Sequence, residues 1–242
     1  MANRQRAEAR RKAQAKAAHS SAEGGGSRTG IWIGLAAVIA LVVGIIVFAS
    51  RDDSGSSSAT DTTIGSSLPV SQPVTVTGEP LAAFDAANSP DPAVGVDAPL
   101  LSGLNFASEP IVIDPATKGP YMLVFLAHWC PHCNAEVPRL NDWKHSGAVP
   151  AELNVIGVAT AVSATAANYP PATWFSNKGW EWPVMVDEAT GDGAAGKAAV
   201  AYGATGWPYF VIVGADGKVK VRVSGEVEIS ELQTIVDAAL AA

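Results

Sequence analysis

The chain has 242 residues, a formal net charge of −7 and two cysteines. This length allows one domain of ordinary size with tails or two small domains, and two cysteines exclude a fold held together by several disulfide bridges. The charge is divided unevenly, with +5 over residues 1–29, −6 over residues 30–97 and −6 over residues 98–242. The division predicts segments of different kinds rather than one uniform globule.

The segment 30–50 has the length and composition of a transmembrane helix. Residues 29–50 carry no charge and are mainly Ile, Val, Leu, Ala and Gly; as a helix they span about 33 Å, enough for the hydrocarbon core of a bilayer. The basic tail, residues 1–29, precedes the segment, so the positive-inside rule keeps the N-terminus in the cytoplasm. We therefore predict a single-pass signal anchor at 30–50, embedded in the lipid bilayer of the cell membrane, with the rest of the chain outside.

Other interpretations of this N-terminal region are open. A cleaved signal peptide is one, because residues 47–49 resemble a cleavage site, although the apolar run is longer than that of most signal peptides. A buried core helix is another, but a core helix of this length would usually carry a polar face. Nucleic-acid binding is not expected of the basic tail, which contains no aromatic residue and no recognition motif.

Residues 51–97 have the composition of a disordered linker. Ser, Thr, Gly or Pro occupies 22 of these 47 positions, and Phe84 is the only aromatic residue among them. Such a segment buries too little apolar surface to offset the entropy cost of ordering it. We therefore predict that the folded domain covers residues 98–242.

That domain is predicted to be a mixed α/β fold. Residues 121–127 (YMLVFLA) and 153–160 (LNVIGVAT) are continuous apolar runs, which are typical of strands buried on both faces. The stretch between them leaves room for one helix, so the pair predicts a βαβ unit with parallel strands. Further strands are expected at 111–113, 184–186 and 209–213.

The C-terminal part is predicted to be a hairpin followed by a helix. The Asp-Gly pair at 216–217 signals a hairpin turn, and the strand after it alternates basic residues with valines up to Val223. The alternation predicts an edge strand with a solvent-exposed basic face that includes Arg222. The final helix is predicted to begin with a capping box formed by Ser230 and Gln233.

Both cysteines lie in one motif, which directly follows the apolar run 121–127: His128-Trp129-Cys130-Pro131-His132-Cys133. One helical turn between the cysteines brings the two sulfurs close enough to bond. Pro131 suits the first helical position, which places Cys130 at a helix N-terminus, where unpaired N–H groups and the helix dipole favour a thiolate. We expect Cys130 to attack a disulfide, and Cys133, deeper in the helix, to act second.

Alternative roles for the two cysteines follow from other chemistry. A structural zinc site needs two further ligands at suitable spacing, and the chain has no other cysteine. An inert disulfide would remove little chain entropy because it closes a very small loop. Cu(I) binding through both cysteines with His128 or His132 stays open, as does a non-catalytic domain that keeps only the fold. The peroxidatic P-x₃-T-x₂-C pattern is missing, which disfavours a thiol peroxidase.

Residues from about 95 to 242 resemble the thioredoxin superfamily, and more narrowly its membrane-anchored TlpA/ResA-like branch. The resemblance is carried by residues at fixed spacing that match the pattern W-C-x-x-C-x-x-E-x-P and the later G-x-P…D-G ending: Trp129, Cys130, Cys133, Glu136, Pro138, Gly206, Pro208 and Gly217. The dipeptide between the cysteines, Pro131-His132, is instead the one found in DsbA-like oxidants.

The resemblance implies a thioredoxin-like fold, a redox-active disulfide between Cys130 and Cys133, and no metal or organic cofactor. It also implies that Pro208 follows a cis peptide bond and that Trp207 and Pro208 form a loop that pairs with an extended segment of the substrate.

The supporting residues implied around the cysteines are Trp129, Pro131, His132 and Glu136. His132 is expected to stabilise the Cys130 thiolate. Glu136 is either an exposed, solvated charge or, if it faces the cysteines, a carboxylate that tunes proton transfer at Cys133. Thioredoxins and DsbA proteins carry a buried acidic residue where this chain has Val124, which leaves Glu136 as the nearest candidate proton acceptor.

Together these observations predict a membrane-anchored, extracytoplasmic thiol–disulfide oxidoreductase. Its expected partners are protein thiols or disulfides outside the membrane and a membrane redox partner that resets the cysteine pair. The direction of exchange, reductant or oxidant, stays open because the DsbA-like dipeptide and the TlpA/ResA-like surroundings point in opposite directions. A copper-binding metallochaperone of the same superfamily is the alternative.

Overall fold

The computed structural model describes residues 68–242. The predicted basic tail, the predicted anchor at 30–50 and the first part of the predicted linker lie outside the described residues. Within residues 68–242, no helix is both long enough and apolar enough to cross a membrane.

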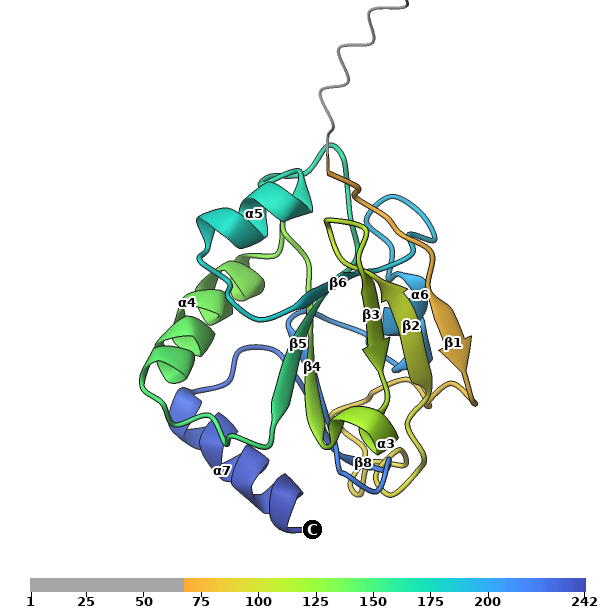
Figure 1. Ribbon diagram of the computed structural model, residues 1–242, viewed down its shortest axis with the longest axis vertical. Helices are drawn as coiled ribbons and strands as arrows, with labels where there is room; N and C mark the ends of the chain where they lie inside the picture. Colours follow the sequence, from red (N-terminus) through yellow and green to blue (C-terminus); the bar gives the residue numbers. More distant parts are fainter. Residues whose placement is uncertain (1–67) are drawn as a thin grey trace, which may run out of the picture. The chain divides into compact units, whose positions relative to one another are not determined.

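Within this part of the chain, eight strands form one mixed sheet in the order β1-β2-β6-β5-β4-β7-β8, and β3 pairs with β2 outside that path (Figure 1). Their bounds are β1 Thr75–Thr77, β2 Leu100–Leu104, β3 Pro110–Ile113, β4 Tyr121–Leu126, β5 Asn154–Ala159, β6 Val184–Val186, β7 Tyr209–Val213 and β8 Val219–Ser224. The strands predicted from the apolar runs are therefore present at the expected places.

The centre of the sheet is the fully buried strand β4. It pairs in parallel with β5 and antiparallel with β7, so it has no free edge and every one of its side chains is inside the protein. This explains why its sequence is a continuous apolar run rather than an alternating one. The predicted βαβ unit is confirmed, with helix α4 (Pro131–His145) connecting β4 to β5.

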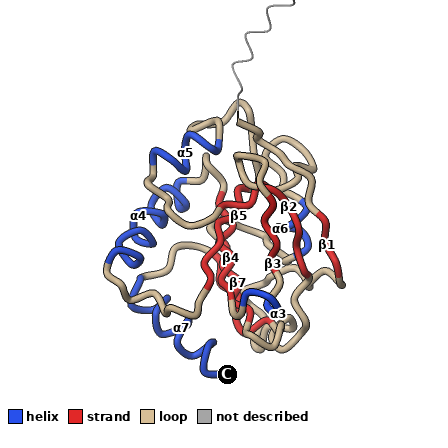
Figure 2. Tube along the Cα trace, viewed as in Figure 1, coloured by secondary structure: helices blue, strands red, loops and turns tan. Residues whose placement is uncertain are grey.

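Helices cover the two faces of the sheet. On one face lie α4, α5 (Pro171–Asn177) and α7 (Ile229–Ala241), and on the other lies α6 (Lys197–Ala201) (Figures 1 and 2). The short helix α3 (Pro115–Lys118) precedes β4. Two clusters of buried side chains fill the layers, one beneath α4, α5 and α7 and one beneath α6.

Residues 68–97 were predicted to belong to the disordered linker, and the structure differs. Strand β1 pairs with β2, and scattered apolar side chains of this segment, Val74, Leu81 and Ala93, are buried against the sheet. The prediction used the Ser/Thr/Gly/Pro content averaged over 51–97, and such an average does not register a few apolar residues that anchor the segment. The folded unit thus includes about thirty residues, 68–97, that were predicted to be linker.

The same segment corrects the predicted exposed face of β8. Arg222 is buried, and its guanidinium Nε donates to Asp91 Oδ2 at 2.8 Å and its Nη1 to the Ala82 carbonyl at 2.7 Å. The same segment also pairs with the start of β8 through its backbone: the Gly95 N–H donates to the Val219 carbonyl, and the Val219 N–H donates to the Val96 carbonyl. Alternation alone predicted a solvated face, because a covering segment more than a hundred residues away leaves no local signal.

The capping box predicted for the last helix is wrong. Helix α7 begins at Ile229 with Glu228 as its N-cap, and no side chain makes a capping hydrogen bond there. Ser230 and Gln233 therefore lie inside the helix, and Gln233 Oε1 accepts a hydrogen bond from Trp143 Nε1 at 2.6 Å. A tertiary contact with α4 engages the residue that the local motif assigned to the cap.

Candidate active site

The two cysteines lie at the junction of the central strand and the helix that follows it. Cys130 is the N-cap residue of α4 and Pro131 is at its first turn, as the motif predicts. Cys130 N–H donates to the Ala127 carbonyl at 3.0 Å, which fixes the turn between β4 and α4. Cys130 therefore lies at the positive end of the α4 dipole, and its sulfur makes no capping hydrogen bond to the helix.

The two thiols differ in their surroundings. Both are free, and Cys130 keeps 5% of its surface exposed whereas Cys133 keeps none. Burial raises the pKa of the Cys133 thiol far above its ordinary value, and the nearby groups of Cys130 and Glu136 raise it further. Cys133 is thus a protonated thiol until a base removes its proton, and only Cys130 reaches the surface.

The loop before β7 meets Cys130 directly. The Trp207–Pro208 peptide bond is cis, and Cys130 Sγ donates to the Trp207 carbonyl at 3.4 Å. The structure thereby brings together two parts of the sequence, 77 residues apart, that the resemblance placed in one site.

Glu136 is buried, not a solvated surface charge. None of its surface is exposed, and burial raises its pKa from 4.5 to about 7. One carboxylate oxygen, Oε2, accepts from the Val227 N–H at 3.3 Å and from Arg139 Nη1 at 3.4 Å. The other oxygen, Oε1, has no hydrogen-bond partner within residues 68–242. Glu136 follows Cys133 by three helical positions, so the two share one face of α4.

His132 projects from the first turn of α4 into solvent and meets a residue that the sequence analysis did not single out. Its Nδ1 donates to Glu226 Oε1 at 2.7 Å, and the other oxygen of Glu226 accepts from Arg139 Nη1 at 2.9 Å. Glu226 lies in the loop between β8 and α7, 94 residues from His132.

His128 and Trp129 are held in place by backbone groups. His128 Nδ1 bonds to the Ala167 carbonyl at 2.8 Å, and its Nε2 receives the Ser163 N–H at 3.3 Å. Burial lowers the pKa of His128, so the ring is neutral and both of its nitrogens are occupied. Trp129 Nε1 donates to the Ala161 carbonyl at 2.6 Å.

A polar network behind the helix start was also not predicted. Asn134 Nδ2 donates to the Cys130 carbonyl at 2.9 Å, and Asn134 Oδ1 accepts from Trp174 Nε1 at 2.9 Å. These bonds join the first turn of α4 to α5. Asn134 carries no motif in the sequence, and only the packing of α5 shows its role.

No metal site is evident in the described region. Within residues 68–242, no group of three or more His, Cys, Asp or Glu side chains is arranged to hold a metal ion. His128, which was considered as a copper ligand, has no free nitrogen because of its two backbone contacts.

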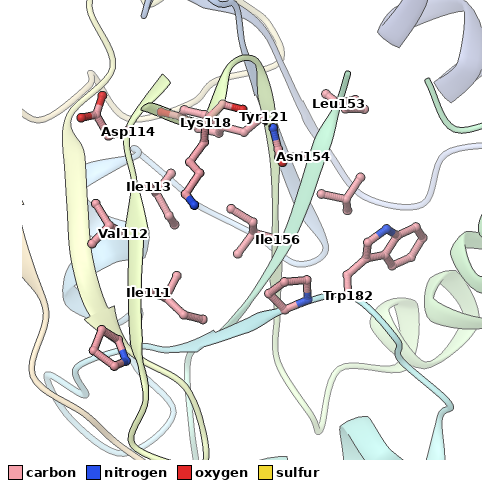
Figure 3. Close-up of a pocket in the computed structure, with 13 residues that line it drawn as sticks. Ile111, Val112, Ile113, Asp114, Lys118, Tyr121, Leu153, Asn154, Ile156 and Trp182 are labelled. Atoms are coloured by element: carbon pink, nitrogen blue, oxygen red, sulfur yellow. Dashed lines mark hydrogen bonds between the residues drawn. The ribbon is translucent and has the colours of Figure 1, made fainter. Parts of the chain in front are cut away.

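A cavity of about 400 Å³ lies far from the cysteines, between β3 and the start of β5. Figure 3 shows the Lys118 side chain reaching into it between Ile113 and Ile156. Its walls include the first residues of β4 and β5, whereas Cys130 follows the opposite end of β4. The cavity is therefore separate from the dithiol site.

Fold and site together define a thioredoxin-like α/β protein with a dithiol at the junction of a buried strand and a helix. The sequence profile of the AhpC/TSA family matches residues 94–222. The chain therefore belongs to the AhpC/TSA family. No curated protein matches the chain.

The chain is similar to several solved structures. One is a thiol:disulfide interchange protein of the thioredoxin family from Chlorobium tepidum, with 24% identity, a TM-score of 0.47 and coverage of 59% of this chain and 94% of the other. Another is StoA from Bacillus subtilis, with 16% identity, a TM-score of 0.45 and coverage of 60% and 99%. A third is a thiol-disulfide isomerase from Corynebacterium glutamicum, with 18% identity, a TM-score of 0.44 and coverage of 52% and 82%.

Proposed function

We propose that the protein is a membrane-anchored, extracytoplasmic thiol–disulfide oxidoreductase that exchanges disulfides with protein partners through Cys130 and Cys133. The observation that carries the proposal is the asymmetric dithiol, with Cys130 at a helix N-terminus and 5% exposed, and Cys133 wholly buried one turn below. This arrangement separates an attacking sulfur from a resolving sulfur.

In the reducing direction, the Cys130 thiolate attacks a sulfur of the partner's disulfide. One new S–S bond forms between Cys130 and the partner, and the partner's other sulfur leaves as a thiolate. Cys133 then loses its proton and attacks the Cys130 sulfur, which releases the second partner thiolate and leaves a disulfide between Cys130 and Cys133. The oxidising direction runs the same steps backwards, beginning with attack of a substrate thiolate on the Cys130 sulfur.

Glu136 is the group that takes the proton of Cys133 in this scheme. Its pKa of about 7 lets the carboxyl gain and lose a proton near neutral pH. Its Oε1 has no partner within the described residues and is free to receive the proton. Because burial raises the pKa of the Cys133 thiol strongly, a nearby base is needed before that sulfur can attack.

The loop at Trp207 and Pro208 holds the partner in this proposal. The Trp207 carbonyl lies 3.4 Å from the Cys130 sulfur, so a substrate segment that runs along this backbone in an extended conformation presents its own sulfur to Cys130. Main-chain pairing of this kind accepts many sequences, which suits an enzyme that acts on several proteins.

The predicted anchor at 30–50 keeps this domain on the outer face of the membrane, where its partners are extracytoplasmic protein thiols or disulfides and a membrane redox protein that resets the pair. The proposal covers both directions of exchange, and the reduction potential of the cysteine pair decides between them. A potential near −120 mV identifies an oxidant, and one of about −270 mV or lower identifies a reductant.

The test combines that potential with trapping of partners. We expect the full chain to equilibrate with glutathione through a disulfide between Cys130 and Cys133. The Cys133→Ala variant should accumulate mixed disulfides on Cys130, and the matched Cys130→Ala variant should accumulate none. Absence of mixed disulfides on Cys133→Ala would refute the proposal, and stoichiometric Cu(I) binding without disulfide exchange would favour the metallochaperone instead.

A further inference from the structure

Three consecutive residues of the loop between β8 and α7 each contact a different part of the dithiol site. Gly225 N–H donates to the Pro208 carbonyl at 2.8 Å. Glu226 accepts from His132 Nδ1 at 2.7 Å. Val227 N–H donates to the Glu136 carboxylate at 3.3 Å. The loop therefore touches the substrate loop, the histidine between the cysteines and the buried acid.

Of these three contacts, the one made by Glu226 depends on a side chain and a charge. Its two carboxylate oxygens hold His132 on one side and Arg139 on the other, at 2.7 and 2.9 Å. Hydrogen bonding from His132 and attraction by Arg139 lower the pKa of Glu226, so the carboxylate is ionised at neutral pH. A negative charge thus lies beside His132, the residue between the two cysteines, and beside Arg139.

Glu226 also acts on the buried acid through a shared partner. Arg139 Nη1 lies 2.9 Å from Glu226 Oε2 and 3.4 Å from Glu136 Oε2, so one guanidinium serves two carboxylates. The guanidinium lowers the pKa of Glu136, and the Glu226 charge raises it. The other charged group facing Arg139 is Glu228, at 3.7 Å from Nη2, and the thiol facing Glu136 on its own helix is that of Cys133.

We propose that Glu226 is a positioning residue for the redox pair, which orients His132 at the site entrance and holds Arg139 between the two carboxylates, and so sets both the reduction potential of the cysteines and the protonation of Glu136. The part that concerns the potential rests on the proposed function. The part that concerns Glu136 is a property of the folded protein and can be measured without any redox partner.

Glu226→Gln removes the charge and keeps a carbonyl oxygen that can accept from His132. Without the negative charge of Glu226, the Cys130 thiolate of the reduced form is repelled less, so the reduced form becomes more stable relative to the disulfide form. We expect the equilibrium constant with glutathione to shift about threefold toward the reduced protein, which corresponds to about 14 mV at 29.6 mV per tenfold change. The midpoint of Glu136 titration should move to lower pH, because the repulsion by the Glu226 charge is gone and Arg139 is then shared by Glu136 and Glu228 only.

The experiment measures both quantities on the full chain in detergent, for the parent protein, Glu226→Gln and Glu228→Gln. The Glu136 midpoint is read from the side-chain carboxyl signal in ¹³C NMR spectra of the reduced protein. Glu228→Gln removes the same charge from the same loop and is the matched control. Among residues 68–242 the Glu228 side chain pairs with Arg139 only, and 75% of it is exposed. We expect this variant to change the potential less than Glu226→Gln does.

Three results would overturn the inference: an unchanged potential and Glu136 midpoint in Glu226→Gln, shifts in the opposite direction, or equal shifts in Glu228→Gln. Failure of the proposed function looks different, because then the parent protein itself forms no disulfide with glutathione while the Glu136 midpoint still moves in Glu226→Gln.

Discussion

Replacing Glu136 with glutamine tests the buried carboxyl beneath the cysteines. Glutamine has the same shape but cannot ionise, so the variant removes the cost of a charge in a site with no exposed surface. The pKa of Glu136 is raised from 4.5 to about 7, and burial is the largest cause. At 1.36 kcal/mol for each pKa unit, the ionised form is disfavoured by about 3 kcal/mol in the folded protein.

The sign of the effect on stability follows from proton binding. Below pH 4.5 the carboxyl is protonated in the folded and the unfolded chain, so it adds no pH dependence. Between pH 4.5 and 7 the unfolded chain releases the proton that the folded protein keeps, and the stability of the parent protein therefore falls as the pH rises. Above pH 7 the full cost is present.

We therefore expect Glu136→Gln to be more stable than the parent protein by up to about 3 kcal/mol at pH 8, and to lose that pH-dependent advantage at pH 4. The assay is urea unfolding of the reduced full chain in detergent at both pH values, with the exposed Glu231→Gln as the control for the loss of one charge. The same change in unfolding free energy at pH 4 and pH 8 would refute the reasoning, because it would show that Glu136 ionises as easily in the folded protein as in the unfolded chain.

Three further predictions concern other parts of the chain. Arg222→Met leaves Asp91 without its partner and should cost about 3–5 kcal/mol of unfolding free energy; adding Asp91→Asn should recover part of this loss, and a double variant no more stable than the single one would contradict the pairing. Gly196→Ala would place a Cβ in steric conflict with the buried Asp187 carboxyl group and should cost about 1–3 kcal/mol, seen as a lower Tm; an unchanged Tm would mean that Asp187 moves freely. The full chain should stay with the membrane fraction after carbonate extraction, and a chain starting at residue 51 should not. Release of both chains would contradict the predicted anchor at 30–50.

The central elements of the fold could be predicted because their sequence signals are local. The apolar run of β4 needs no partner to be recognised, and the CxxC motif directly after it places Cys130 at a helix start whatever else surrounds it. The Asp-Gly pair at 216–217 likewise specifies its turn without help from distant residues.

The features that were missed depend on contacts between distant residues. Arg222 looked exposed because its partner Asp91 is 131 residues away. Glu226 could not be recognised from its neighbours in the sequence, because its role depends on a contact with His132, 94 residues earlier. Ser230 and Gln233 satisfied a local rule for a helix start, yet Gln233 is engaged by Trp143 of another helix. Local patterns can assign elements, but which polar side chains meet is decided by how those elements pack.

The backbone bonds that join residues 95–98 to the start of β8 have a consequence for contacts between copies of the protein. Val219 exchanges hydrogen bonds with Gly95 and Val96, and the Ala98 N–H donates to the Gly217 carbonyl. An outermost strand with unpaired backbone groups is a template for aggregation, and here the first part of that strand is already occupied by the chain's own upstream segment. A second copy of the chain therefore finds no unpaired backbone groups at Val219, where a strand added to this edge would begin.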